Sequence, residues 1–170
     1  MKIVGLIGEP AAGKSTVMRN FIATLAPCSA IVKDGLVTYT LFPEDKVIIA
    51  GIYDEQVFSG TDRLSKGCGP KYREWIAKQN ADCEWDDYTF YWEGERFSNS
   101  KFFHFFYNEC PDATVYYLQC DEKMLNERNA NRSNQNDSWR KGMKTRMNNL
   151  CREWPVVKVA QGFALPALVR

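Results

Sequence analysis

The chain has 170 residues, of which 45% are hydrophobic and 25% are charged, and these values are typical of one globular domain with one core. Its formal net charge is +1, so the overall field does not indicate a nucleic-acid-binding protein, although a local basic patch could still exist. The first apolar run is too short for a signal peptide, and no stretch approaches the roughly 18 apolar residues of a membrane span. We therefore expect a cytoplasmic protein with no membrane partner.

The first third of the chain predicts one strand, one helix and three further strands. Residues 2–7 form a short apolar run typical of a buried parallel strand, and residues 15–26 have helical periodicity and end before a proline. Residues 30–53 contain three runs of β-branched and aromatic residues, separated by an Asp-Gly pair and by a Pro-Glu-Asp-Lys turn. The second and third runs predict an antiparallel hairpin inserted into the fold.

The rest of the chain alternates helices with strands. Ser98 and Ser100 are N-cap candidates for one of these helices. Because strands alternate with helices, we expect a single α/β domain over residues 1–170 with a mainly parallel sheet. The pattern predicts helices from about Lys71 and over 98–110, 121–132 and 139–154, and strands over 88–92, 114–120 and 156–160.

Residues 8–15 read GEPAAGKS and match the pattern G-x-x-x-x-G-K-[ST] at every fixed position. Glycines permit backbone angles that turn successive N–H groups inward, which forms an anion site at the N-terminus of a helix. A glycine-rich turn before an amphipathic helix is the alternative, but the strand before and the helix after favour a nucleotide site. The residues predicted to bind a nucleoside triphosphate here are Gly8, Ala11, Ala12, Gly13, Lys14, Ser15 and Thr16.

Within this loop, Lys14 and Ser15 are the predicted chemical groups. Lys14 would reach the β- and γ-phosphates of ATP and act in catalysis, and the hydroxyl of Ser15 would be a ligand of Mg²⁺. Such a loop does not by itself separate kinases from GTPases or motor ATPases. The Asn-Lys-x-Asp motif by which GTPases read the base is absent, and motor ATPases have much larger chains.

Glu93 is a second candidate, because it stands at a predicted strand end. A carboxylate in that position can act as a base or reach Mg²⁺ through water. The alternative is a charge at a helix N-terminus or a surface ion pair. We predict that Glu93 is a catalytic residue and a metal ligand.

Basic residues gather between residues 128 and 146, where the polar sequence SNQNDS separates two predicted helices. Lysine and arginine on a closing lid can neutralise the charge of a transferring phosphoryl group and exclude water. We therefore predict a lid-like segment over about 128–146, with Arg132 as a catalytic residue and Arg128 as a nucleotide ligand. A solvated basic face is the alternative.

Together these features resemble the nucleoside and nucleotide kinase family of P-loop proteins. The resemblance rests on the GEPAAGKS loop, on the sequence EGER at a strand end, and on LNERNANR and WRKGMKTR as a lid. It implies a P-loop NTPase fold of the nucleotide-kinase type with three layers, and a kinase that uses ATP and Mg²⁺.

The sequence GTDRLS, residues 60–65, offers the groups that an acceptor site needs. A carboxylate can take the proton of an acceptor hydroxyl, so Asp62 is predicted to be a catalytic base. Arg63 can hold an acceptor phosphate through a bidentate contact. The alternative is that Thr61 or Asp62 simply caps the next helix. The residues predicted to bind the acceptor are Asp34, Arg63, Arg96 and Arg140.

The hairpin, residues 51–65 and the sequence SWRKGMKTRMNNL resemble one phage branch of these kinases, which phosphorylates 5-hydroxymethyluracil in DNA. The resemblance implies an acceptor that is a primary alcohol on a pyrimidine within a DNA strand. Tyr53, Phe58 or Trp75 would then stack on a flipped base.

Two other functions are compatible with the same residues. A deoxynucleoside monophosphate kinase would use Arg63 and the lid arginines to hold the phosphate of a free deoxynucleotide. A non-catalytic nucleotide-binding module would bind ATP and transfer nothing. Retention of a phosphate lysine, a metal-binding hydroxyl and acidic residues favours catalysis over binding alone.

Overall fold

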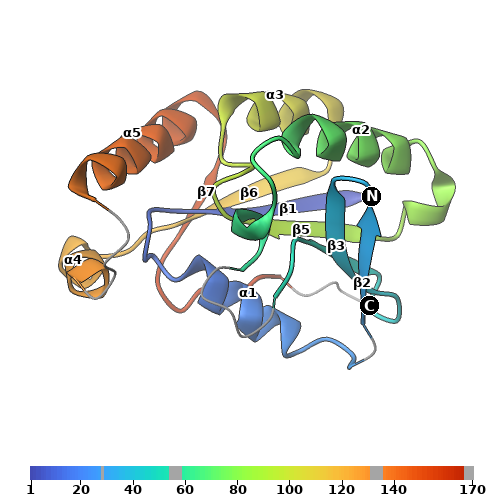
Figure 1. The fold of residues 1–170 in the computed structure, drawn as a ribbon, viewed down its shortest axis with the longest axis horizontal. Coiled ribbons are helices and arrows are strands. Elements are labelled where there is room, and N and C mark those ends of the chain that lie inside the picture. The colour runs from blue at the N-terminus through green and yellow to red at the C-terminus, as the bar shows by residue number, and fades with distance from the viewer. Residues whose placement is uncertain (28, 54–58, 131–135, 167–170) are drawn as a thin grey trace.

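The computed structural model describes residues 1–27, 29–53, 59–130 and 136–166. These residues form one mixed sheet of seven strands with helices on both faces (Figure 1). No helix in these ranges is long and apolar enough to cross a membrane. In chain order the elements are β1 (Lys2–Ile7), α1 (Lys14–Ile22), β2 (Ala30–Asp34), β3 (Val37–Phe42), β4 (Val47–Ala50), a 3₁₀ turn (Thr61–Arg63), α2 (Gly69–Asn80), a second 3₁₀ turn (Cys83–Trp85), β5 (Thr89–Glu93), α3 (Ser100–Glu109), β6 (Ala113–Leu118), α4 (Glu122–Ala130), α5 (Asp137–Glu153) and β7 (Val157–Val159).

The strand order is β2-β3-β4-β5-β1-β6-β7. The five strands from β4 to β7 in this order pair in parallel, whereas β2, β3 and β4 pair antiparallel. The α/β class with a mainly parallel sheet is therefore confirmed. The predicted hairpin is present as β3 and β4, and because β4 also pairs with β5, the hairpin extends the main sheet.

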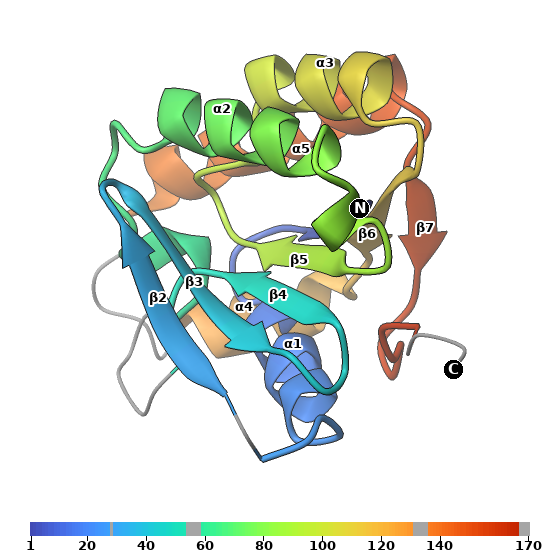
Figure 2. The ribbon, with the colours of Figure 1, turned by 90° about the vertical axis from the view of Figure 1, so that its right-hand side faces the viewer.

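Helices cover both faces of the sheet. The helix α1 lies on one face, and α2, α3 and α5 lie on the other (Figure 1 and Figure 2). The central strands β1 and β5 need cover on both faces, since all of β5 and every residue of β1 after Lys2 is buried. This burial explains why the sequence shows continuous apolar runs there rather than alternation.

Aromatic side chains fill much of the core on the face covered by α2 and α3. Trp92 is fully buried and stacks on Phe106 with ring centroids 5.4 Å apart. Trp75 is 7% exposed and packs on Tyr39 with centroids 4.9 Å apart. The prediction that Trp75 stacks on a base is therefore wrong, because its ring is already enclosed by core residues.

Several helix ends differ from the prediction by a few residues, and two of the differences have a clear local cause. The helix α1 ends at Ile22, earlier than expected, because the chain continues in i→i−3 turns. Asn99, rather than Ser98 or Ser100, caps α3: its side-chain oxygen accepts the N–H group of the third residue beyond it, at 3.2 Å. Ser98 donates its hydroxyl to the carbonyl oxygen of Gly94 instead, at 2.7 Å.

Candidate functional site

The candidate site lies at the edge of the sheet where β1 and β5 end. These strands are parallel neighbours, with Leu6 paired to Glu93. After β1 the chain forms the loop of residues 8–13 and enters α1, whereas β5 ends at Glu93 itself. Ligands of open α/β sheets bind in the crevice outside the carboxyl ends of the strands. The loop and Glu93 are therefore placed where such a ligand would lie.

The loop between β1 and α1 folds around its own lysine. Nζ of Lys14 donates hydrogen bonds to the carbonyl oxygens of Gly8 and Glu9, both at 3.0 Å. Gly13 has a φ of 97° and is the N-cap of α1, and no side chain of the described residues caps this helix. A Cβ at Gly8 would lie 2.9 Å from the carbonyl oxygen of Leu118, so only glycine fits. A helix N-terminus without a side-chain cap leaves N–H groups for an anion.

Glu93 is 1% exposed and contacts the end of this loop. Its Oε1 accepts hydrogen bonds from Oγ of Ser15 at 3.0 Å and from the hydroxyl of Tyr53 at 3.1 Å. Burial raises the pKa of Glu93 from 4.5 to about 7; the Lys14 ammonium opposes this rise, and the Asp62 carboxylate adds to it. The Glu93 carboxylate at the end of β5 is thus hydrogen-bonded to the hydroxyl of Ser15 in the first turn of α1.

Asp62 is held beside Glu93 by the 3₁₀ turn. Oγ1 of Thr61 donates to the carbonyl oxygen of Glu93 at 2.8 Å, and the N–H group of Glu95 donates to Oδ1 of Asp62 at 2.6 Å. Burial raises the pKa of Asp62, and the Glu95 N–H group and the Lys14 ammonium lower it. Lys14, Asp62 and Glu93 therefore act on one another electrostatically and form one cluster.

Gly60 allows this cluster to pack. Its φ is 65°, and a Cβ there would lie 2.5 Å from the hydroxyl of Tyr53 and 2.6 Å from Oε1 of Glu93. We expect Gly60→Ala to lower the free energy of unfolding by about 2–4 kcal/mol, because the methyl group adds both backbone strain and overlap. Gly67→Ala is the matched control, since a Cβ on Gly67 meets nothing within 4 Å. Urea unfolding measures both variants, and equal midpoints would contradict this packing.

Ser15 and Glu93 also fit a magnesium site. Mg²⁺ is usually held by one or two protein oxygens together with phosphates and water, rather than by a cage of protein ligands. The Ser15 hydroxyl and the Glu93 carboxylate already lie within 3.0 Å of each other. Among the described residues, no group of three or more His, Cys, Asp or Glu side chains could hold a metal. Mg²⁺ at these two oxygens would need further ligands, such as phosphate oxygens and water.

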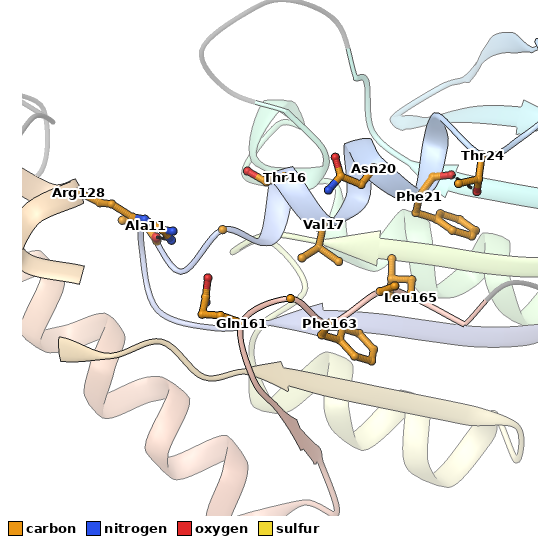
Figure 3. Close-up of a pocket in the computed structure, with 13 residues that line it drawn as sticks. Ala11, Thr16, Val17, Asn20, Phe21, Thr24, Arg128, Gln161, Phe163 and Leu165 are labelled. Atoms are coloured by element: carbon orange, nitrogen blue, oxygen red, sulfur yellow. Dashed lines mark hydrogen bonds between the residues drawn. The ribbon is translucent and has the colours of Figure 1, made fainter. Parts of the chain in front are cut away.

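A pocket of about 930 Å³ lies beside the loop, between α1 and the segment after β7 (Figure 3). At one end Arg128 donates from Nη1 to the carbonyl oxygen of Ala11, at 3.1 Å. On the side facing α1, Gln161 donates from Nε2 to the carbonyl oxygen of Ala12, at 2.9 Å. The volume lies in the range of small-molecule sites. Its larger apolar walls are Val17, Phe21, Phe163 and Leu165.

The sequence alone did not identify this pocket, because residues 161–165 carry no motif. One signal was present: the segment directly follows the last parallel strand, so it had to emerge at the same edge of the sheet as the loop. Tyr53 was expected only as a stacking residue, whereas its hydroxyl donates to Glu93. Neither the position of residues 161–165 beside the loop nor the hydrogen bond from Tyr53 to Glu93 can be predicted from the local sequence pattern.

Two of the predicted acceptor ligands lie close to Asp62. Arg63 belongs to the same turn, and Arg96 donates from Nε to the carbonyl oxygen of Leu64 at 3.1 Å. Asp34 is exposed at the end of β2, three strands from β5, which corresponds to about 14 Å. The fold thus brings Arg63 and Arg96, rather than Asp34, next to the carboxylates.

The predicted lid segment falls on two helices. Arg128 lies near the end of α4, donates a hydrogen bond to the loop and lines the pocket beside it. Thr16, a predicted nucleotide ligand, lines that pocket from α1. Arg140 is half-buried on α5. Met143 and Met147 of α5 are buried in the main core, so the later part of the segment is anchored. The candidates outside the described residues are Arg132 and Phe58.

Comparison with known proteins does not assign the chain to a family. No protein-family model matches the sequence, and a search of curated proteins finds no match. The functional conclusion therefore depends on the arrangement of Lys14, Ser15, Asp62 and Glu93.

Glu93 makes the stability of the ligand-free protein depend on pH. Its folded pKa of about 7 lies above its ordinary value of 4.5, so the stability that its protonated form contributes is complete below pH 4.5 and is lost as pH rises through 7. Glu93→Gln removes this loss, and at ~1.4 kcal/mol per pKa unit the variant should gain about 3 kcal/mol relative to the parent across this range.

Urea unfolding in the presence of a chelator, at several pH values, measures this difference. Glu127→Gln, which neutralises an exposed carboxylate on α4, is the control and should run parallel to the parent. A Glu93→Gln difference that is the same at low and high pH would show that the carboxyl group is not protonated by burial.

Proposed function

We propose that the protein is an ATP-dependent phosphotransferase of the P-loop kinase type. The observation that carries this proposal is the hydrogen bond from Ser15 to Glu93, which joins the end of the GEPAAGKS loop to a buried carboxylate on the neighbouring strand. Backbone N–H groups, a lysine, a hydroxyl and a carboxylate thereby share one edge of the sheet. These are the groups that hold the phosphates and Mg²⁺ of a nucleoside triphosphate.

The loop and the adjacent pocket would bind the donor nucleotide. The phosphates would lie on the N–H groups of residues 8–15, with Nζ of Lys14 exchanging two backbone carbonyls for phosphate oxygens. Ser15 and Glu93 would hold Mg²⁺, which neutralises phosphate charge when bound. The base would lie between α1 and residues 161–165, where the pocket is apolar and Arg128 marks the end nearest the loop.

Asp62 would receive the acceptor. The acceptor oxygen attacks the γ-phosphorus, the bond from that phosphorus to the β–γ bridging oxygen breaks, ADP leaves, and the hydroxyl proton passes to Asp62. Burial raises the pKa of this carboxyl group, which makes its anion a stronger base. An alcohol must lose a proton in this reaction whereas a phosphate acceptor need not, so a buried carboxylate favours an alcohol.

With the resemblance in residues 51–65 and in α5, this chemistry favours the hydroxymethyl group of 5-hydroxymethyluracil in DNA as the acceptor. The position of Arg63 and Arg96 beside Asp62 favours a second candidate, a deoxynucleoside monophosphate kinase, because both cations could hold the phosphate of a free nucleotide.

The test is transfer of label from γ-labelled ATP with Mg²⁺ to three acceptors: DNA that contains 5-hydroxymethyluracil, the same DNA with thymine, and free deoxynucleoside monophosphates. Label in the hydroxymethylated DNA alone is the expected result. Label in a free monophosphate would establish the second candidate instead. Label in none of them, with ATP still bound, would reduce the protein to a nucleotide-binding module.

A further inference from the structure

A second pocket, of about 420 Å³, lies between the N-termini of α2 and α3 and is called the α2–α3 groove below. The two helices pack side by side above the sheet (Figure 1 and Figure 2). Both helices begin on the side of the sheet where the candidate active site lies, because α3 is the next element after the carboxyl end of β5 and α2 is the next element after the turn that contains Asp62. The groove is lined by Lys66, Cys68, Gly69, Pro70, Arg73, Arg96, Asn99, Ser100, Lys101 and Phe102.

Four of these residues are basic and none is acidic. In the part of the chain that the structure describes, Lys66, Arg73, Arg96 and Lys101 form no ion pair. By contrast, Lys144 on α5 forms an ion pair with Glu122 on α4, so its charge is balanced. Although the net charge of the whole chain is only +1, these four cations give the groove a local positive charge.

The arginines are held by contacts that leave their charge at the groove. Arg73 lies over the ring of Phe102 at 5.4 Å, and a Cβ on Gly69 would lie 3.9 Å from its Nη1. The guanidinium of Arg73 thus sits at the first residue of α2. The N-terminal ends of α2 and α3 carry partial positive charge of their own, which adds to that of the side chains.

Arg96 connects the groove with the reacting groups. It donates to the carbonyl oxygen of Leu64, which directly follows the turn that contains Asp62. Burial raises the pKa of Asp62 and of Cys68, and the positive charge of Arg96 opposes both rises. Since Cys68 lines the groove, Arg96 is near both the candidate base and the groove.

We propose that the α2–α3 groove binds backbone phosphate of a polynucleotide acceptor, next to the nucleotide whose hydroxyl faces Asp62. This inference rests on the proposed function, and it specifies a polymeric acceptor. A free nucleotide in the acceptor site offers one phosphate group, whereas a nucleic-acid strand offers a charge about every 3.4 Å. Four cations distributed over two loops and two helices match the strand rather than the single phosphate.

The test compares two double variants with equal change of charge. Lys66→Glu/Lys101→Glu reverses two exposed charges of the groove, and Lys78→Glu/Lys123→Glu reverses two exposed charges on α2 and α4 outside it. Fluorescence anisotropy measures binding of a short labelled single-stranded DNA at several salt concentrations. Calorimetry measures binding of ATP and of a free deoxynucleoside monophosphate.

We expect the groove variant to bind the DNA at least about 10-fold more weakly and to lower the salt slope by about 1.4, at ~0.7 per lost phosphate contact on a single strand. Binding of ATP and of the free monophosphate should stay as in the parent, and the control variant should bind DNA as the parent does. Equal DNA binding by the two double variants would overturn the proposal, as would a parent protein that does not bind DNA.

Weaker binding of both the free monophosphate and the DNA by the groove variant would also overturn the proposal, since the groove would then bind a single acceptor phosphate. A different result would overturn the proposed kinase function. If no acceptor is phosphorylated but the groove variant still binds DNA more weakly than the parent, the groove binds polynucleotide and the kinase proposal is wrong.

Discussion

Lys14→Ala is expected to lower the rate of phosphate transfer by about 10³-fold or more at saturating ATP. Its ammonium is the cation that would meet the charge developing on the transferring phosphoryl group, and it already contacts two carbonyl oxygens of the loop and acts on the charge of Glu93. No other described lysine is tied to the loop of residues 8–13 by a hydrogen bond. Initial rates of label transfer from ATP measure the effect.

The fold should tolerate this change, which makes the loss of rate interpretable. Lys14 contributes two hydrogen bonds to the loop, so the thermal midpoint should fall by no more than about 4 °C, or about 1 kcal/mol for a domain of this size. Lys78→Ala removes an exposed lysine from the last turn of α2 and should leave both rate and midpoint unchanged. Transfer at the parent rate by folded Lys14→Ala would contradict the proposed function.

Local pattern predicted the parts of the site that local physics determines. The loop of residues 8–15 was identified from its glycines and its lysine, because a tight anion-binding turn restricts which residues fit. The strands β3, β4 and β5 follow from β-branched and aromatic runs bounded by turns. The sequence changes from aromatic to charged residues at Glu93, and this change alone predicts that the strand ends there.

The contacts across the chain were not predictable in the same way. Glu93 meets Ser15, 78 positions away, only because β5 lies next to β1 in the sheet, whereas β2, β3 and β4 intervene in sequence. Residues 161–165 face α1 for the same reason, since β7 returns the chain to that edge. For Trp75 the sequence predicts a contact that the fold does not allow. An aromatic residue could stack on a base, but the ring of Trp75 is enclosed by Tyr39 and other core residues.

Asp62→Asn is expected to lower the rate of transfer by about 10²–10⁴-fold if Asp62 removes the acceptor proton. Asparagine keeps an oxygen that can accept the N–H group of Glu95, so the turn should hold its position while the base is lost. Affinity for ATP should stay as in the parent. Single-turnover rates and calorimetry measure the two quantities, and Asp86→Asn, on an exposed carboxylate at the opposite end of β5, is the control.

The pH dependence separates a base from a residue that only positions the acceptor. In the parent, the rate should rise with pH as Asp62 loses its proton, and burial raises the pKa of Asp62 above its ordinary value. In Asp62→Asn that rise should disappear from the profile. If the rate falls only a few-fold and the rise persists, the proton goes elsewhere, and Glu93, whose pKa of about 7 already suits a base near neutrality, becomes the group that takes it.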